Sequence, residues 1–357
     1  MNRTSIGYVD YSWNPITGCL HGCPYCYARR IAERFRDTDF DQYRNHYPEE
    51  YVFSVLKPMT RFKKGSFDIT GAPFPYGFQP TFHQYRLDEP KRKKLTKADV
   101  KARITKGWLP QNQEDPLRIF VCDMGDIMGA WVPTEWINAV LQVVRDCPQH
   151  IFLFLTKNPK RYPEFEWPAN AHLGTTVESQ DKDWRIVELL KAKASVYWLS
   201  VEPMLGPLDV KQYFPQASRA YAILSRYYGP NGFDPTGSQP EQSRIPGLDL
   251  IVGGGQSGPG ARPVHPDWIR SLRDQCQAAG TAFYLKQLGE WVQVGECMNG
   301  QDDSKYYLSP KARIVNHEGG QGFHGAGAIY MQRVGKKAAG RLLDGRTWDE
   351  FPVMPGA

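Results

Sequence analysis

The sequence lacks any long hydrophobic run. No stretch of its 357 residues approaches the roughly 18 apolar residues of a membrane-spanning helix. The first residues form no apolar signal core either. Hydrophobic residues make up 41% and charged residues 23%, which is typical of a globular chain with a sizeable core. We therefore expect a soluble, cytoplasmic protein with no membrane partner.

Cysteine is also scarce, and its distribution excludes a disulfide framework. Of the seven cysteines, Cys122, Cys147, Cys276 and Cys297 are scattered along the chain. A reducing cytoplasm would keep such residues as thiols. No internal repeat of solenoid length is visible. The sequence thus predicts neither a disulfide-stabilised extracellular scaffold nor a repeat protein.

The other three cysteines are concentrated in one short stretch. Cys19, Cys23 and Cys26 are spaced C-x3-C-x2-C, with Tyr25 before the last, in a loop rich in glycine and proline. Three thiols so close together cannot all pair as disulfides, but they can converge on a metal ion or an iron–sulfur cluster. Two alternatives stay open: a zinc site completed by His21 or a distant cysteine, and a buried trio without metal.

This spacing, with an aromatic residue before the third cysteine, resembles the cluster loop of the radical SAM superfamily. The wider match resembles a phage- and bacteria-associated three-cysteine family placed beside those enzymes. The matching stretches are Trp13-Asn14-Pro15, Thr17-Gly18-Cys19, Cys26-Tyr27-Ala28, Leu155-Thr156-Lys157, Glu202-Pro203, Val252-Gly253-Gly254 and Lys337-Ala338-Ala339-Gly340-Arg341.

The resemblance implies a set of cofactors. Cys19, Cys23 and Cys26 would hold a 4Fe-4S cluster whose fourth iron has no protein thiolate. That iron would bind S-adenosyl-L-methionine, which an electron cleaves to a 5′-deoxyadenosyl radical. An external donor such as flavodoxin or ferredoxin would supply the electron.

Hydrophobic patterning predicts alternating strands and helices. Strands are expected at 8–13, 117–122, 151–156, 172–178, 196–202, 248–255 and 282–286, and helices at 27–37, 134–144, 180–193 and 266–279. Thr134 is predicted as the N-cap of its helix. The alternation indicates a parallel α/β fold, either an open doubly wound sheet or a partial barrel.

The resemblance and the loop after the first strand favour a partial (β/α)6 TIM-like barrel. The barrel is predicted over residues 1–290, with loop-rich insertions at about 60–115 and 215–245. A Gly-rich C-terminal extension, residues 291–357, is predicted to pack on it.

Ligands of α/β folds lie beyond the carboxyl ends of the strands, so polar residues there are candidates for cofactor binding. Asp123 and Asp126 follow the second strand, where related enzymes hold the cofactor's amino group, although the Asp-Met-Gly-Asp sequence departs from their motif. Glu178, Ser200 and Glu202 end later strands and are predicted to bond the ribose or methionine moiety. For each, an N-cap or a structural ion pair is the alternative.

Other strand ends supply the remaining candidates. Gly253 and Gly254 permit close approach of a ligand, and we expect them at the adenine. Lys157, Arg262 and His265 are predicted to face an anionic, polar substrate. Cys122 is a candidate hydrogen-atom donor to a substrate radical, against the alternative of an ordinary buried thiol.

Charge is uneven along the chain. Residues 88–106 contain eight basic and three acidic side chains, a net +5 (8 − 3) out of +6 for the whole sequence. Such a run predicts a DNA or RNA partner bound through residues 90–106, the alternative being a solvated insertion.

The leading hypothesis is therefore a radical SAM enzyme acting on a polar, nucleic-acid-related substrate, in repair or base modification. The alternative from another class is a non-enzymatic nucleic-acid-binding protein whose cysteines hold a structural zinc. An electron-transfer protein ranks third, because a fourth nearby cysteine is missing.

Overall fold

A computed structural model describes seven parts of the chain: residues 1–35, 51–62, 69–106, 116–215, 247–296, 311–319 and 325–352. Most of the insertion predicted at 215–245 lies outside them. The chain divides into two compact units, here called unit 1 (residues 1–174 and 193–195) and unit 2 (175–192 and 196–357). The division predicted from sequence, at residue 290, stays a prediction. Among the described residues, no helix combines the length and apolarity needed to cross a membrane.

The main sheet has eight strands in the described part of the chain, in the order β1-β2-β8-β9-β10-β11-β12-β13. Their bounds are β1 Asn2–Arg3, β2 Tyr11–Trp13, β8 Leu117–Val121, β9 His150–Thr156, β10 Ala171–Thr176, β11 Val196–Val201, β12 Leu250–Gly254 and β13 Ala282–Gln287. The seven predicted strands are confirmed, and β1 adds an antiparallel edge.

The strand order decides between the two predicted arrangements. It follows the chain without reversal, as in a barrel, whereas a doubly wound sheet reverses at a switch point. Parallel pairing joins β2 to β8, β8 to β9, β11 to β12 and β12 to β13. β1 and β13 lie at opposite ends of this order and are not neighbours of each other, so the barrel does not close and is partial. The predicted fold class is confirmed, with eight strands in place of six.

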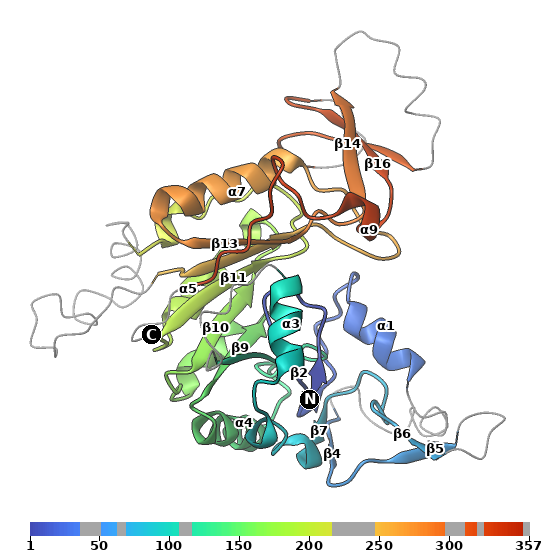
Figure 1. Cartoon of the computed structure of the whole chain (residues 1–357), viewed down its shortest axis with the longest axis vertical. Coiled ribbons are helices and arrows are strands. Elements are labelled where there is room, and N and C mark those ends of the chain that lie inside the picture. Colours follow the sequence, from blue (N-terminus) through green and yellow to red (C-terminus); the bar gives the residue numbers. More distant parts are fainter. Residues whose placement is uncertain are drawn as a thin grey trace, which may run out of the picture. The chain divides into compact units, whose positions relative to one another are not determined.

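Helices alternate with these strands (Figure 1). The helices are α1 Tyr27–Arg34, α3 Lys97–Thr105, α4 Thr134–Asp146, α5 Trp184–Leu190, α7 Pro266–Ala279 and α9 Lys336–Ala339. Short 3₁₀ turns are η2 Gln84–Arg86, η3 Pro90–Arg92, η4 Pro159–Glu164, η5 Gln180–Lys182 and η6 Lys211–Tyr213. The helix predicted at 180–193 is thus a 3₁₀ turn followed by the shorter α5.

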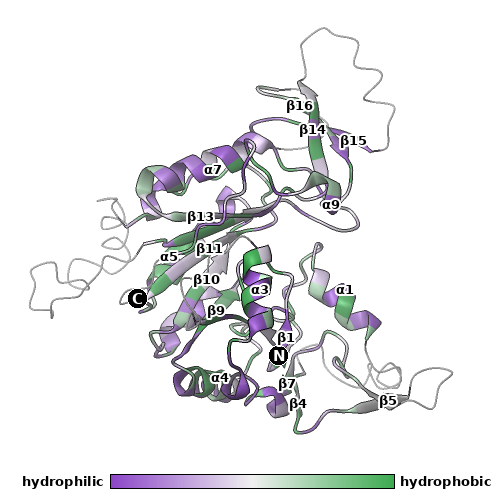
Figure 2. Ribbon diagram, viewed as in Figure 1, coloured by the Kyte–Doolittle hydropathy of each residue, from purple (hydrophilic) through white to green (hydrophobic). Residues whose placement is uncertain are grey.

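Local chemistry sets the helix ends. The predicted cap at Thr134 is wrong: Pro133 occupies the cap position and Thr134 begins α4, because the fixed φ of proline suits the entry to a helix. Helix α7 is capped at its C-terminus by Gly280, whose φ of +67° favours glycine. Hydrophobic residues of α7 form one stripe and polar ones another, and the apolar stripe packs on β12 and β13 (Figure 2).

The insertion predicted as loop-rich contains regular elements. Within it, β5 Thr60–Phe62 pairs with β6 Ile69–Gly71, and β7 Thr81–His83 forms a small sheet with two strands that precede the insertion, β3 Ile16–Thr17 and β4 Phe53–Val55. Helix α3 begins with a capping box, in which Thr96 and Asp99 bond each other's backbone amides.

The basic segment is partly committed to internal contacts of unit 1. Arg103 is 3% exposed and pairs with the buried carboxylate of Asp10, Nη2 to Oδ2, at 2.8 Å. The Lys106 ammonium donates to three backbone carbonyls, those of residues 4, 6 and 9. The basic side chains left exposed on this segment are Lys91, Arg92, Lys94, Lys97 and Lys101.

The C-terminal part of unit 2 contains a second small sheet, β14-β16-β15. Its strands are β14 Trp291–Glu296, β15 Ala312–Val315 and β16 Ile329–Arg333. Beyond α9 the chain returns to β13: the Leu285 amide donates to the Trp348 carbonyl at 2.9 Å, and the Glu350 amide donates to the Phe283 carbonyl at 3.2 Å. The tail thereby covers a sheet edge that would otherwise expose unpaired backbone groups.

Candidate cofactor site

The cysteine loop connects β3 to α1 in unit 1. All three thiols are partly exposed and free of disulfide bonds. Cys26 is the N-cap of α1, since its Sγ accepts the Arg29 amide hydrogen at 3.4 Å. The Cys19 Sγ accepts the His21 amide hydrogen at 3.5 Å. The loop therefore holds three partly exposed cysteines on a turn closed by its own backbone, and burial raises the pKa of the Cys19 thiol.

Glycine and an apolar cluster hold this loop in place. Gly18 has a φ of +87°, and a Cβ at this position would lie 2.2 Å from the Gln79 carbonyl oxygen. Its amide donates to the Met124 carbonyl at 2.9 Å. Cys19 and Cys26 pack against a buried cluster of Ala28, Ala32, Phe74, Phe78 and Met124. The first and last cysteines are thus seated by packing.

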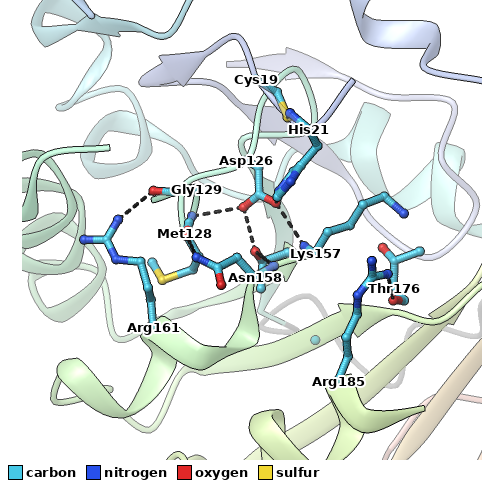
Figure 3. Close-up of polar contacts among 12 residues, drawn as sticks. Cys19, His21, Asp126, Met128, Gly129, Lys157, Asn158, Arg161, Thr176 and Arg185 are labelled. Atoms are coloured by element: carbon cyan, nitrogen blue, oxygen red, sulfur yellow. Dashed lines mark hydrogen bonds and ion pairs between the residues drawn. The ribbon is translucent and has the colours of Figure 1, made fainter. Parts of the chain in front are cut away.

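Asp126 fastens the loop to the end of β9 (Figure 3). Its Oδ2 lies 2.8 Å from the His21 Nε2 and accepts the Lys157 amide at 2.9 Å. Its Oδ1 accepts the Thr156 hydroxyl at 2.7 Å and the Met128 amide at 3.0 Å. His21 lies between Cys19 and Cys23, so the buried carboxylate joins the loop to the neighbouring strand.

The surroundings of Asp126 favour its ionised form. Burial acts to raise the pKa of the carboxyl, but the hydrogen bonds from His21, Lys157 and Thr156 outweigh it and hold that pKa below its usual range. A carboxylate offers about four acceptor positions, and these four bonds occupy them. Asp126 therefore positions other residues of its own chain. For Asp126 to bind a cofactor's amino group, one of its four hydrogen bonds would have to break.

Lys157 makes a second link to the loop. Its ammonium Nζ donates to the Tyr25 hydroxyl at 3.0 Å and lies 5.3 Å from the centre of that ring. Tyr25 immediately precedes Cys26. The end of β9, which bonds Asp126, therefore also holds the aromatic residue beside the third cysteine. Lys157 was predicted to face substrate, and in the structure its ammonium contacts the cysteine loop.

Asp123 is engaged differently from Asp126. Its two carboxylate oxygens accept the Asn14 amide at 2.6 Å and the Ser12 hydroxyl at 2.9 Å. Asn14 in turn accepts the Met124 amide at 3.0 Å. Asp123 is partly exposed, so a ligand could reach its carboxylate.

Cys122 is fixed in a strained turn after β8. Its φ is +58°, in the left-handed region that few residues other than glycine adopt. The side chain is 2% exposed, and burial raises the pKa of the thiol. The thiol is therefore packed and protonated, and its predicted role as a hydrogen-atom donor, which also requires a protonated thiol, stays a prediction.

The spacing of the three thiols bears on the metal they fit. Among the described residues, His265, Asp267 and His317 form a group of candidate ligand atoms all within 4.8 Å of one another, whereas the three cysteines do not. Tetrahedral zinc with Zn–S bonds near 2.3 Å would bring its sulfurs to about 3.8 Å apart. Thiolates bound to three different irons lie farther apart than this, so three thiols that are not all within 4.8 Å of one another are compatible with a cluster.

In unit 2, Glu202 is the centre of a polar group at the ends of β11 and β13. Its Oε2 lies 2.7 Å from the Lys286 Nζ, and its Oε1 accepts the Gln287 amide at 2.5 Å. A Cβ on Gly254 would lie 3.3 Å from the Glu202 carboxyl carbon, so the glycine lets the carboxylate approach the strand. The structure brings together Glu202 and Gly254, both selected from the sequence, with Lys286.

The other predicted cofactor residues of unit 2 are buried. Glu178 forms an ion pair with Arg185 at 2.8 Å, and the same guanidinium nitrogen donates to the Thr176 carbonyl at 2.8 Å. Ser200 is 4% exposed. Gly253 lies against the Phe283 ring, 3.4 Å from its would-be Cβ.

The two predicted substrate residues of unit 2, Arg262 and His265, contact different groups. Arg262 donates through Nε to the Gln256 side-chain oxygen at 2.8 Å. His265 is 2% exposed and is the N-cap of α7, and burial lowers its pKa. His265 is thus engaged as a helix cap, and its predicted contact with substrate stays a prediction.

Sequence reasoning missed several residues of these groups. The sequence indicates His21 only as a zinc ligand and Tyr25 only as the aromatic residue of the cysteine spacing, and it indicates no role for Gln287 or Arg185. The sequence does show that His21 and Tyr25 lie between the cysteines, and this position alone indicates that they belong to the site. Their partners Asp126 and Lys157 come from strand ends far along the chain, and only the fold shows the pairing.

Fold and site together define the class: an α/β partial barrel with a three-cysteine loop anchored by the strand ends of unit 1. The chain belongs to the family described as "Protein of unknown function (DUF5131)", whose model matches residues 3–352. A comparison with curated proteins found no match.

Among solved structures, spore photoproduct lyase complexed with dinucleoside spore photoproduct is similar at 11% identity and a TM-score of 0.36, covering 93% of this chain and 71% of that chain. A double mutant of the lyase with bound AdoMet and dinucleoside spore photoproduct gives the same values. At this TM-score the likeness is too loose to assign a function, which depends on the residues of this chain.

Proposed function

We propose that this protein is a radical S-adenosylmethionine enzyme in which Cys19, Cys23 and Cys26 hold a 4Fe-4S cluster. The observation that carries the proposal is the anchored loop: three partly exposed cysteines on a turn fixed by Asp126 and Lys157, with no fourth cysteine near them in the sequence. When bound, the cluster would supply the electron that cleaves S-adenosylmethionine to a 5′-deoxyadenosyl radical. Flavodoxin or ferredoxin in the cytoplasm would be the donor.

The chain's own residues have distinct tasks in this proposal. His21 and Tyr25, held by Asp126 and Lys157, keep the loop in one conformation, so that the thiols are presented without further ordering. Asp123, whose side chain is partly exposed, is the candidate contact for the cofactor's ammonium group.

In unit 2 the proposal assigns cofactor contacts to Glu178, Ser200, Glu202, Gly253 and Gly254, as the sequence predicted. Arg262 remains the candidate for substrate binding in this unit. Glu202 already has a cationic partner, Lys286, so its ion pair is the group that a bound ligand would rearrange.

For the substrate we propose a nucleic acid, for repair or base modification, contacted by the exposed basic residues of segment 90–106. Arg103 and Lys106 are excluded from this role because they serve inside unit 1. Replacing Lys94, Lys97 and Lys101 with alanine should weaken DNA or RNA binding and flatten its salt dependence by about three units of slope at most. An unchanged affinity and slope would reject this surface.

The test of the enzyme class is anaerobic purification and cluster reconstitution. We expect about four irons and four sulfides per chain, and formation of 5′-deoxyadenosine when the reduced protein meets S-adenosylmethionine. Both should be lost in Cys19→Ala, Cys23→Ala and Cys26→Ala. One zinc per chain at the cysteines and no iron chromophore would instead support the alternative of a nucleic-acid-binding protein with structural zinc.

A further inference from the structure

A second group of metal-ligand side chains lies in unit 2, far along the sequence from the cysteines. His265 and Asp267 lie at the start of α7, and His317 follows β15. One ligand atom from each lies within 4.8 Å of the other two. The Asp267 Oδ2 is 2.8 Å from the His317 Nε2 and 3.8 Å from the His265 Nδ1. The two imidazole centres are 4.7 Å apart.

We propose that His265, Asp267 and His317 bind one divalent transition-metal ion of the zinc class. Two imidazole nitrogens and a carboxylate oxygen are a donor set that such ions prefer. With bonds near 2.0–2.1 Å, tetrahedral ligand atoms lie about 3.4 Å apart. The observed separations of 2.8 and 3.8 Å bracket this value, so small side-chain movements complete the geometry.

Neighbouring groups orient two of the three ligands. The His265 Nε2 donates to the Gly327 carbonyl at 2.9 Å, which leaves Nδ1 as the ring nitrogen with a lone pair. Metal-binding histidines commonly donate their other N–H to a carbonyl in this way. The Asp267 Oδ1 accepts the Arg270 guanidinium at 2.6 Å, which leaves Oδ2 directed toward both rings.

The backbone turn at Gly327 helps to place the third ligand. Gly327 has a φ of +64°, and a Cβ there would lie 2.2 Å from the His317 ring. The Trp268 indole donates to the His317 carbonyl at 2.8 Å, tying the loop after β15 to α7. His317 and Asp267 are about half exposed, so an ion could enter from solvent and water could fill its fourth position.

One contact opposes binding. The His265 Nδ1 accepts the Asp267 amide hydrogen at 3.1 Å as the cap of α7, and an ion would take that lone pair. We therefore expect a weaker site than a closed structural zinc site. A helix cap explains His265 and an ion pair explains His317, but neither explains why both rings converge on the same carboxylate oxygen.

This proposal uses no cysteine and is independent of the proposed function. The test is calorimetric titration of Zn²⁺ into the full chain carrying Cys19→Ser, Cys23→Ser and Cys26→Ser, which removes the thiolate ligands. We expect one Zn²⁺ per chain. Adding His317→Ala or Asp267→Asn should weaken binding by at least about tenfold, whereas Glu318→Gln, an exposed neighbour outside the group, should not.

Two further measurements keep the result interpretable. A thermal melt without zinc checks that each variant folds; His317→Ala is the decisive one, because its side chain is 47% exposed. In the wild-type chain with its cysteines filled by iron, His317→Ala should remove the same zinc equivalent. The proposal is overturned if the serine variant binds no zinc, or if His317→Ala binds it as tightly as its parent.

Discussion

The cysteine loop and the histidine group arrange possible metal ligands in opposite ways. The three cysteines fall within residues 19–26, yet their thiols are not brought within 4.8 Å of one another. His317 lies 50 residues after Asp267, yet the two side chains meet at 2.8 Å. Closeness in sequence and closeness in space thus select different groups of candidate ligands in this chain.

The supports of the two regions differ as well. Asp126 is 5% exposed and gives all four acceptor positions to its own chain, so it holds the cysteine loop and is unavailable to a metal. Asp267 is 45% exposed and directs one oxygen toward two imidazoles. A buried carboxylate whose acceptor positions are all filled positions other residues. A half-exposed carboxylate with one oxygen close to two imidazoles is suited to bind a metal ion.

The largest expected effect separates the two regions completely. Cys19→Ala, Cys23→Ala and Cys26→Ala together should abolish iron binding and leave zinc binding by the histidine group intact. His317→Ala should remove zinc binding by the histidine group and leave iron binding intact. Iron, sulfide and zinc analysis of the purified variants checks both. If either substitution removed both metals from a folded chain, the two regions would not be independent.

The two carboxylates should differ in their effect on stability. Asp126→Asn should lower the free energy of unfolding by about 2–4 kcal/mol, because several buried donors lose an ionised acceptor. Asp267→Asn, in the absence of metal, should cost under about 1 kcal/mol, because its ion pairs are screened by solvent. Denaturant unfolding of both variants measures this, and equal losses would show that burial does not distinguish them.

Buried histidines near each region should make stability depend on pH. Burial, with a lesser effect of Arg86, lowers the pKa of His83 to about 2, and burial also lowers the pKa of His265. An unfolded histidine titrates near 6.5. Both contributions are therefore complete above that pH and are lost as the pH falls below it, because the unfolded chain then binds more protons.

His83 bonds Thr17, next to the cysteine loop, at 2.9 Å. We expect His83→Gln to reduce the fall in unfolding free energy between about pH 7 and pH 5. Denaturant titrations at several pH values provide the measurement. An unchanged pH dependence in this variant would mean that His83 is protonated in the folded chain.

The smallest effect concerns the second link to the loop. Tyr25→Phe removes the hydroxyl that accepts from Lys157 but keeps the ring over which the ammonium lies. The expected loss of stability is about 0.5–1 kcal/mol, with cluster reconstitution retained. Thermal melts and iron analysis check this, and loss of the cluster would show that the hydroxyl does more than hold the loop.

Sequence patterns predicted the main sheet well because its strands are apolar on both faces. The run ending at Thr156 is buried almost throughout, and its bounds match the prediction within a residue or so. Helix α3 was missed because its buried positions are Asp99 and Arg103, so it has no apolar stripe to detect. Strands β3 to β7 are only two or three residues long, which is too short to show a period of two.

The candidate site was predictable only where its residues are close in sequence. Cys19, Cys23 and Cys26 form a local pattern. The role of Asp126 depends on Thr156 and Lys157, which a neighbouring parallel strand brings to it. His265 was selected from its place near a strand end, but Asp267 and His317 complete its group through the tail of unit 2, which no local pattern indicated.

The central claim is that the cysteine loop holds a cluster with one iron left open for S-adenosylmethionine. Electron paramagnetic resonance of the reduced, reconstituted protein tests it most directly. We predict a cluster signal that changes on addition of S-adenosylmethionine and is absent from the triple alanine variant. A signal that S-adenosylmethionine leaves unchanged, or a cluster that persists without the three cysteines, would contradict the claim.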